Sequence, residues 1–299
     1  MQLVTAPLGA MLALAATLAP PDCAVRLEAA SEQLLLDRHA PIVLLAPGER
    51  ALPASVAWYL ARSSVDGAPA STIADAPGSC GESGCRDAHL RPRSDARGGA
   101  PERSEWTVYG HVFATADGGL ALQYWFFYPF NDFHRLGDHE GDWEHVTVRL
   151  DAALRPIGAW YARHDVNAPG AWYAWRELER EGDHPVVLAA RGSHASYADP
   201  GDVEWYDAAC PTRRPAEAEG RRCAIWRTWD AACGGVLPTG GRERPRAGAG
   251  FVRFAGRWGS PGAPPGPAYQ PGWCAGGVAS TVDGPAGIGS IAATDGAER

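Results

Sequence analysis

The sequence of 299 residues contains no lysine, so all 27 of its basic residues are arginine. Because alanine and glycine are also abundant, we attribute this bias to a GC-rich genome rather than to phosphate recognition. Acidic residues number 35 and the formal net charge is -8. A protein of this charge is not expected to bind nucleic acid through its phosphates regardless of sequence.

Long hydrophobic runs are scarce. The only extended apolar stretch, Leu8–Leu18, is too short to span a bilayer comfortably but has the length of a signal-peptide core. No arginine or lysine precedes it, and a buried N-terminal helix is the alternative. We expect residues 1–22 to be a signal peptide. The protein would then be secreted or periplasmic, with no transmembrane segment after signal removal.

The sequence also lacks the CxxC pairs that zinc knuckles use. Its cysteines stand at positions 23, 80, 85, 210, 223, 233 and 274. Short spacing favours the disulfides Cys80–Cys85 and Cys210–Cys223, which leaves Cys233 to pair with Cys274, although other connectivities stay open. Cys23 is left over, and would be either removed with the leader or free.

Short apolar runs alternate with turn signals along most of the chain. Val25–Arg38 has leucines at helical spacing and predicts a short helix. Asp117-Gly118-Gly119 is a strong hairpin signal. The segments expected to be strands are Pro41–Ala46, Ser55–Ala61, Trp106–Ala114, Leu120–Phe130, Asp142–Leu150, Arg155–Arg163, Ala171–Arg176, Pro185–Ala190 and Phe251–Trp258.

This pattern predicts an all-β fold with minor α content. We expect an antiparallel β-sandwich with long loops and a short N-terminal helix, formed as a single domain by residues 25–275. Residues 63–105, rich in glycine, proline, serine and charge, predict a long loop. Residues 276–299 predict a flexible tail. The oligomeric state does not follow from the sequence.

One octapeptide concentrates side chains of the kinds that bind metals. Asp138–His145 (DHEGDWEH) holds two histidines, two aspartates and two glutamates around one tryptophan. If a strand starts at Asp142, its alternation puts Asp142 and Glu144 on the same face as the apolar residues that follow. Both carboxylates would lie at the mouth of a core, where a cation could offset the cost of desolvating them.

Two more side chains could reach the same mouth. His139 could turn back from the preceding loop, and Asp132 would arrive there if Leu122–Phe130 pairs antiparallel with the following strand. The candidate metal ligands are therefore Asp132, His139, Asp142 and Glu144. This donor set favours calcium or magnesium, with manganese or zinc as alternatives. A polar loop making turn and cap hydrogen bonds is the alternative without a metal.

His194 follows the expected strand Pro185–Ala190, at a strand end where sites are often built. Its importance depends on whether the fold brings it near Asp142. If a bound metal activates water, Glu144 or His194 would be the candidate general base of a hydrolase. No GxSxG motif stands between a strand and a helix, so serine catalysis is disfavoured.

Several segments, in the right order, resemble the vacuolar protein sorting 62 family. They cover most of the chain from residue 30 to about residue 270: Ala40–Leu60, Tyr124–Leu150, Trp175–Leu178, His184–Gly201 and Phe251–Gly259. The resemblance implies no particular reaction.

The HxxDWE residues His139, Asp142, Trp143 and Glu144 are also distantly similar to the necrosis-inducing (NPP1-like) proteins of plant pathogens. Those proteins carry GHRHDWE on a β-sandwich, where it helps hold a divalent cation used to bind sphingolipid sugar headgroups. The resemblance implies Asp132 and Asp142 as direct ligands. It implies His139 and Glu144 as direct or water-mediated ligands, and His194 as a histidine on the neighbouring strand end. Here Glu140-Gly141 replaces Arg-His, which changes the local charge.

We therefore expect an exported, divalent-cation-binding protein that binds a polar lipid or sugar headgroup at a membrane surface, as a toxin-like or binding protein. A metal-dependent hydrolase is the first alternative, and a purely structural metal site is the second. No reaction is assigned.

Overall fold

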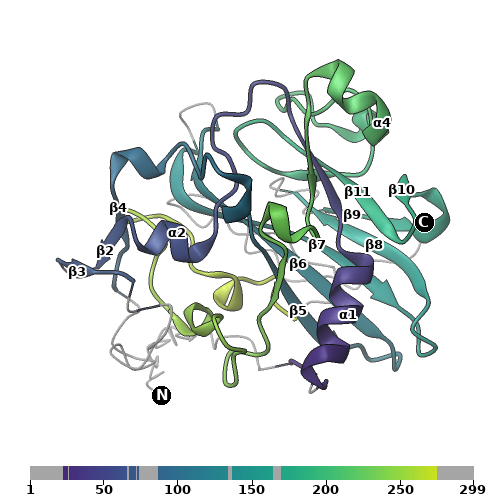
Figure 1. The fold of residues 1–299 in the computed structure, drawn as a ribbon, viewed down its shortest axis with the longest axis horizontal. Coiled ribbons are helices and arrows are strands. Elements are labelled where there is room, and N and C mark those ends of the chain that lie inside the picture. The colour runs from purple at the N-terminus through teal and green to yellow at the C-terminus, as the bar shows by residue number, and fades with distance from the viewer. Residues whose placement is uncertain are drawn as a thin grey trace, which may run out of the picture.

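The computed structural model describes residues 23–25, 27–65, 67–71, 73, 87–133, 137–163 and 170–274. Within these ranges the fold is mostly β, with two main sheets and few helices, as predicted (Figure 1). The expected signal peptide, the expected Cys80–Cys85 disulfide and the expected tail lie outside the described residues.

The larger sheet has six strands. They are β5 (Val108–Ala114), β6 (Leu120–Asn131), β7 (His139–Leu150), β8 (Pro156–Ala162), β9 (Gly170–Ala174) and β14 (Val236–Pro238). Their order is β14-β5-β6-β7-β8-β9, and every neighbouring pair is antiparallel except β14 with β5. The predicted hairpin at Asp117-Gly118-Gly119 joins β5 to β6 and is confirmed.

The second sheet combines segments far apart in the sequence. Its strands are β1 (Ile42–Leu45), β10 (Arg180–Glu181), β11 (His184–Ala189), β12 (Ser196–Tyr197) and β13 (Ala224–Arg227). β1 lies between β11, to which it is parallel, and β13, to which it is antiparallel. A small third sheet of β2 (Ser63–Val65), β3 (Ala68–Pro69) and β4 (Arg91–Pro92) adds structure to the expected loop 63–105.

Tyrosine hydroxyls tie the inner face of the large sheet to the second sheet and to α1. The Tyr161 hydroxyl in β8 donates to the carbonyl of Val186 in β11 at 2.9 Å. The Tyr124 hydroxyl in β6 donates to the carbonyl of Leu36 in α1 (Ala29–His39), also at 2.9 Å. Figure 1 shows α1 lying beside the large sheet, while the small third sheet lies at the opposite side of the molecule. The predicted helix is confirmed and starts at Ala29, with Glu28 as its N-cap.

Two predicted strands are wrong. Ser55–Ala61 contains the helix α2 (Val56–Leu60), because the Ser55 hydroxyl caps it by accepting from the Trp58 backbone N–H at 3.0 Å. Phe251–Trp258 contains a 3-10 turn, Gly250–Arg253, instead of a strand. In each segment one aromatic residue, Tyr59 or Trp258, contacts rings of the large sheet, so the segment is held by these contacts and not by the single buried face of a strand. A further helix, α4, spans Pro215–Ala218.

The outer face of the large sheet is buried as well as the inner one. Trp143 of β7 points outward and contacts the rings of Tyr109, Phe127, Phe251 and Trp258, with centroids 4.7 to 5.9 Å apart. The Tyr59 hydroxyl of α2 donates to the carbonyl of Trp258 at 2.6 Å. This aromatic cover explains why β6 and β7 are buried along nearly their whole length.

The disulfide predictions were partly right. The Cys210–Cys223 disulfide is confirmed, but Cys274 pairs with Cys23, and Cys233 is a free thiol. Ala24 forms a β-bridge to Phe113, so the N-terminal segment runs along β5 and carries Cys23 to Cys274. Short sequence spacing could not reveal this pairing, because it joins residues 251 positions apart.

Gly141 allows β7 to pass close to Trp258. Its φ is +73°, and a Cβ at this position would lie 2.3 Å from the Trp258 carbonyl oxygen. Gly118, in the hairpin turn, has a similar φ of +81° but no atom within 4 Å of such a Cβ. Substitution at Gly118 would therefore introduce backbone strain alone, whereas substitution at Gly141 would introduce both backbone strain and a steric clash.

We predict that Gly141→Ala lowers the free energy of unfolding by about 3 kcal/mol, because it adds overpacking to left-handed strain. Gly118→Ala should cost only about 1 kcal/mol, from the strain alone. Urea unfolding of both variants and the wild type measures the difference. An equal loss in the free energy of unfolding for both variants would show that Trp258 can move away from the added methyl group without a measurable energetic cost.

Candidate functional site

The parallel pairing of β1 with β11 brings two distant loops to one edge of the second sheet. Leu45 and Ala189, at the ends of these strands, are register partners. The chain then leaves β1 toward Glu49 and leaves β11 toward His194. On the other side of the sandwich, in the large sheet, Asp142 of β7 is the register partner of Tyr128 of β6. Four elements thus supply one cluster of polar side chains.

An ion triad of Asp142, His194 and Glu49 forms the centre of this cluster. The His194 Nδ1 is 2.6 Å from the Asp142 Oδ2, and its Nε2 is 3.7 Å from the Glu49 Oε2. All three side chains are almost completely buried. The Tyr128 ring stacks on the imidazole at 3.7 Å between centroids. The fold therefore brings His194 to Asp142, the condition on which its importance depended.

A tight turn directs His194 into the sandwich. His194 has a φ of +56°, and its N–H donates to the Ala190 carbonyl at 3.0 Å. Gly192 has a φ of +81°, and its carbonyl accepts from the Asp132 N–H at 3.0 Å. A left-handed φ at a non-glycine residue costs roughly 1–3 kcal/mol, and the bonds of the triad offset that cost.

Glu49 is held by backbone donors as well as by His194. Its carboxylate accepts from the N–H groups of Arg50, Ala51 and Gly192 at 2.6 to 2.8 Å. Burial alone would raise its pKa, but the His194 charge and these hydrogen bonds outweigh burial and lower the pKa of Glu49 to about 2. Glu49 is therefore ionised over the whole physiological range.

His194 is correspondingly cationic. Burial alone would lower its pKa, but the Glu49 charge and the hydrogen bond to Asp142 outweigh burial and raise the pKa of His194 to about 10. A protonated imidazole cannot accept a proton at neutral pH. The geometry therefore favours His194 as a positioning group rather than as the general base of a hydrolase.

Among the four candidate metal ligands, the structure brings His139 and Asp142 together. The His139 Nε2 is 3.9 Å from the Asp142 Oδ1, the oxygen that His194 does not hold. His139 is the first residue of β7 and not part of a loop, because Asn131 pairs with it. Glu144 follows on the same face and is fully buried.

The other polar residues of the octapeptide have structural contacts. Glu140 accepts from the Arg97 guanidinium at 3.0 Å and from the Ser260 hydroxyl at 2.6 Å, which ties β7 to the C-terminal segment. His145 lies against the Trp125 ring at 4.5 Å. The density of ligand-type side chains in DHEGDWEH therefore reflects both a site and the packing around it.

A pocket of about 600 Å³ lies beside the ion triad. Its lining residues are Gly48, Glu49, Arg50, Asp132, Arg191, Gly192, Tyr206, Asp207 and Ala208. The Asp207 carboxylate accepts from the hydroxyls of Ser193 and Tyr197 at 2.7 and 2.6 Å. Within the described residues, the side chains of Arg50, Arg191 and Asp132 have no such partner and are exposed. Asp132, predicted as a metal ligand, thus lines this pocket.

Sequence reasoning missed Glu49, Arg50 and Arg191. A signal for Glu49 was present, because it follows the apolar run Pro41–Ala46 just as His194 follows Pro185–Ala190. Two parallel neighbouring strands end at the same edge of a sheet, so the residues that follow them lie close together. This argument would have placed Glu49 near His194, but the sequence does not show that the two strands are parallel neighbours.

Aromatic side chains border the pocket. Trp205 is 91% exposed and its ring lies 5.3 Å from that of Tyr206, a lining residue. The Phe133 ring also contacts Tyr206, with centroids 5.7 Å apart. A large exposed tryptophan beside a polar pocket is typical of a surface that contacts a ligand or a membrane interface.

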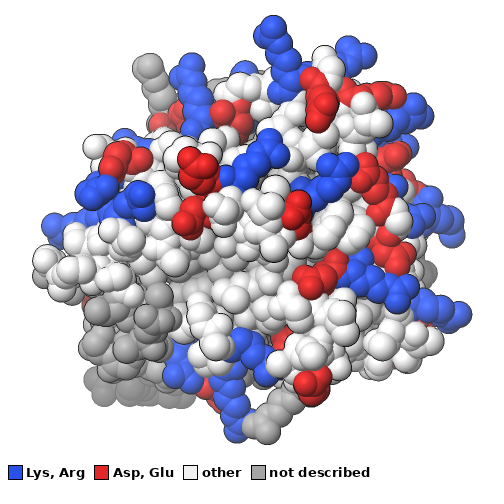
Figure 2. Space-filling view, viewed as in Figure 1, with Lys and Arg blue, Asp and Glu red and all other residues white. Residues whose placement is uncertain are grey.

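Neither charge sign dominates the face of the molecule shown in Figure 2, where basic and acidic side chains are intermixed. Among the described residues, no helix has the length and apolar character needed to cross a bilayer.

We predict that the ion triad contributes most to stability between about pH 4.5 and 6.5, the ordinary pKa values of glutamate and histidine. The raised pKa of His194 means that its contribution is complete below 6.5 and is lost as pH rises toward 10. The lowered pKa of Glu49 means that its contribution is complete above 4.5 and is lost as pH falls toward 2.

Urea unfolding of wild type and His194→Gln in chelator tests this window. We expect the variant to lose about 3 kcal/mol or more inside it, because a buried ion pair is broken. The loss should shrink toward both pH extremes. A loss that does not change with pH would contradict a charged triad.

Comparison with solved structures finds proteins of low similarity. The complex of NLPPya with glucosamine is 15% identical with a TM-score of 0.39, over 77% of this chain and 82% of that chain. The structure of non-toxic HaNLP3 protein is 19% identical with a TM-score of 0.32, over 57% and 68%. At these levels the likeness implies nothing about a ligand.

Two curated relatives come from Saccharomyces cerevisiae. The vacuolar protein sorting-associated protein TDA6 is 30% identical over 114 residues, which are 30% of this chain and 24% of that protein. Vacuolar protein sorting-associated protein 62 is 27% identical over 169 residues, 47% of this chain and 35% of that protein. The chain thus spans a quarter to about a third of the length of these relatives.

A family model agrees with both relatives. The model described as vacuolar protein sorting-associated protein 62 matches residues 26–205, more than half of the chain. The match includes β6, β7 and β11 and every member of the ion triad. The expected resemblance is thereby confirmed: this chain belongs to the vacuolar protein sorting-associated protein 62 family.

Proposed function

We propose that this chain is an exported, divalent-cation-binding β-sandwich protein that binds the polar headgroup of a lipid or a sugar at a membrane surface. The observation that carries the proposal is the pocket beside the ion triad. It presents two guanidinium groups, Arg50 and Arg191, and one carboxylate, Asp132, none of which has a partner within the described residues.

This combination suits a ligand with an anionic group and several hydroxyls or an amine. Guanidinium groups bind phosphate in a bidentate way, and a carboxylate accepts from hydroxyl or ammonium donors. The pocket volume of about 600 Å³ is in the range of small-molecule sites. The proposed ligand is therefore a phosphorylated headgroup, carried either by a lipid or by a free sugar.

The ion triad gives this pocket a rigid wall. Glu49 belongs to both: one oxygen accepts from Gly192 and faces His194, and its neighbour Arg50 lines the pocket. Binding to side chains that are already positioned loses less conformational entropy than binding to mobile ones. Trp205, beside Tyr206, would add contact area where the headgroup meets a membrane.

The divalent cation would bind where His139 and Asp142 meet. Two atoms that bind one ion at about 2.1 to 2.4 Å each can lie up to about 4.6 Å apart. The separation of 3.9 Å between the His139 Nε2 and the Asp142 Oδ1 fits this limit. Glu144 and Asp132 would complete the donor set through water, because within the described residues neither joins His139 and Asp142 in a group of three ligand atoms that all lie within 4.8 Å of one another.

Export is supported by the disulfides. Cys23–Cys274 and Cys210–Cys223 both lie among the described residues. Disulfides persist in oxidising compartments and are rare in the cytosol. The hydrolase alternative would use Glu144 as the general base, because the Asp142 and Glu49 carboxylates on either side of His194 favour its protonated form.

The cation is tested by calorimetric titration of chelator-stripped protein, with its disulfides intact, with calcium, magnesium, manganese and zinc. We expect saturable binding of at least one ion, abolished in Asp142→Asn because a ligand is removed. Asp138→Asn, an exposed change in the same octapeptide, should bind like the wild type. Near-ultraviolet circular dichroism checks that each variant is folded. Failure of all four ions to bind the wild type would refute the cation site.

The headgroup is tested with two probes: phosphatidylcholine vesicles containing phosphatidylinositol, and soluble glucose 6-phosphate. We expect Arg50→Gln/Arg191→Gln to weaken vesicle binding about thirtyfold, since each arginine near an anionic surface contributes about 1 kcal/mol. Arg93→Gln, an exposed arginine paired with Asp95 outside the pocket, is the matched control.

The two probes separate the sources of the headgroup. Trp205→Ala should weaken binding to vesicles only, because the soluble sugar does not offer an interface. Binding of glucose 6-phosphate alone would assign a free sugar as the ligand. If the double arginine variant bound both probes as well as the wild type, the pocket would not be the binding site.

A further inference from the structure

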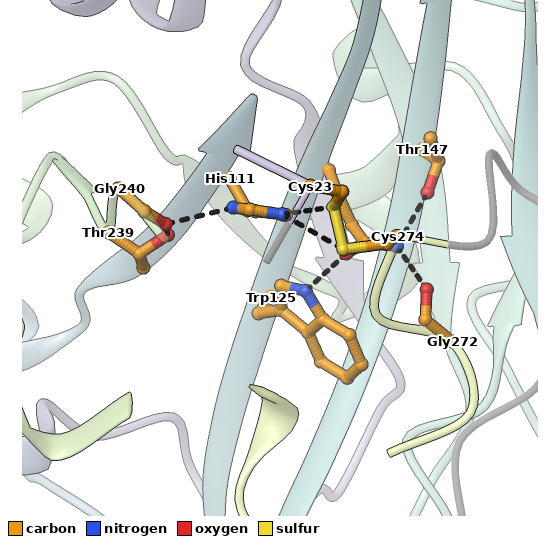
Figure 3. Close-up of a disulfide and its surroundings, with 9 residues drawn as sticks. Cys23, His111, Trp125, Thr147, Thr239, Gly240, Gly272 and Cys274 are labelled. Atoms are coloured by element: carbon orange, nitrogen blue, oxygen red, sulfur yellow. Dashed lines mark hydrogen bonds between the residues drawn. A yellow bond between two sulfur atoms is a disulfide. The ribbon is translucent and has the colours of Figure 1, made fainter. Parts of the chain in front are cut away.

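The Cys23–Cys274 disulfide has a histidine beside it. The His111 Nε2 lies 3.3 Å from the Cys23 sulfur and 3.9 Å from the Cys274 sulfur. Figure 3 shows the imidazole between the disulfide on one side and the Gly240 carbonyl on the other. The nearest potential ligand atoms of the three residues all lie within 4.8 Å of one another.

The hydrogen bond to Gly240 sets the tautomer of His111. Its Nδ1 is 2.9 Å from the Gly240 carbonyl oxygen, which can only accept, so the proton is on Nδ1. The Nε2 therefore directs its lone pair toward the two sulfurs. A histidine whose other nitrogen donates to a carbonyl is the usual arrangement of a metal-bound imidazole.

The surrounding packing holds both ends of this cluster in place. Trp273 stacks on the fully buried His111 ring at 3.7 Å between centroids. The Gln123 amide donates to the carbonyl of Gly272 at 2.8 Å, which ties the chain before Cys274 to β6. Positions of the imidazole and of one cysteine therefore do not depend on the disulfide alone.

We propose that reduction of the Cys23–Cys274 disulfide creates a zinc site formed by Cys23, Cys274 and His111. Tetrahedral zinc, with bonds of about 2.3 Å to sulfur and about 2.05 Å to nitrogen, requires sulfur-to-nitrogen separations of about 3.6 Å. The present separations of 3.3 and 3.9 Å lie on either side of that value. The two sulfurs must move apart to about 3.8 Å, and a water completes the coordination.

Formation of the site has two steps. A dithiol reductant attacks one sulfur, the S–S bond breaks and the resulting mixed disulfide is resolved by the second thiol; two electrons and two protons reach the cysteines and the dithiol becomes a disulfide. Zinc then forms two bonds to sulfur and one to the His111 Nε2, and the two thiol protons pass to solvent. Cys23 and Cys274 are partly exposed, so both reagents can reach them.

The consequence is a second crosslink between the same two segments. The disulfide joins the segment before α1 to the segment after the 3-10 turn Pro267–Tyr269, and its two cysteines are 251 positions apart. When it is reduced, zinc would keep these segments together. The site is independent of the headgroup pocket, and its test does not depend on the proposed function.

The test uses cobalt as a spectroscopic substitute for zinc, added to reduced protein after anaerobic removal of the reductant. We expect thiolate-to-cobalt charge-transfer absorption that saturates at one ion per chain and disappears when zinc is added. Oxidised protein should lack it. Cys23→Ser should lose the signal, and His111→Gln should weaken cobalt affinity by about tenfold or more.

Two further measurements keep the outcome decisive. Cys233→Ser, which removes the thiol that is free among the described residues, and Cys210→Ser/Cys223→Ser, which removes the Cys210–Cys223 disulfide, should keep the wild-type cobalt signal. Zinc should raise the unfolding temperature of reduced wild type but not of reduced Cys23→Ser. Identical cobalt spectra of reduced wild type and Cys23→Ser, or no spectrum in reduced wild type, would overturn the proposal.

Discussion

The buried ion triad of Asp142, His194 and Glu49 is the interaction on which the rest of the site depends. It joins β7 of the large sheet to the loops after β1 and β11 of the second sheet. Removing two carboxylates and an imidazolium from water is costly, so the imidazolium must stay close to both carboxylates to compensate their charge. That requirement fixes the positions of the two loops relative to β7, and the shape of the pocket beside them follows from these positions.

The octapeptide DHEGDWEH shows how one segment can serve both the site and the fold. Asp142 and Glu144 point into the sandwich, while Trp143 on the opposite face packs among aromatic rings. Glu140 joins the C-terminal segment, and Gly141 allows Trp258 to lie against the strand. A substitution here therefore acts through packing as well as through the site, so a ligand role needs variants that separate the two.

The errors in the expected elements have a common physical origin. Ser55–Ala61 and Phe251–Trp258 are short apolar runs whose residues are buried on several sides. The spacing of apolar residues then does not distinguish a helix from a strand. The local structure is decided by single hydrogen bonds, such as the helix cap at Ser55 and the bond from the Tyr59 hydroxyl to the Trp258 carbonyl. The pairing of Cys23 with Cys274 was hidden for a related reason, since it depends on how the N-terminal segment runs along β5.

By itself, the sequence determined the β-rich class, the β5–β6 hairpin, the alternation that places Asp142 and Glu144 on one face, and the family, because these depend on local pattern and on motif order. The tertiary structure decided that Glu49 belongs with His194 and Asp142, that Arg50 and Arg191 border one pocket with Asp132, and that His111 meets a disulfide. Each of these contacts joins segments far apart in sequence, and their separation in space is set by strand order and register, which local patterns do not encode.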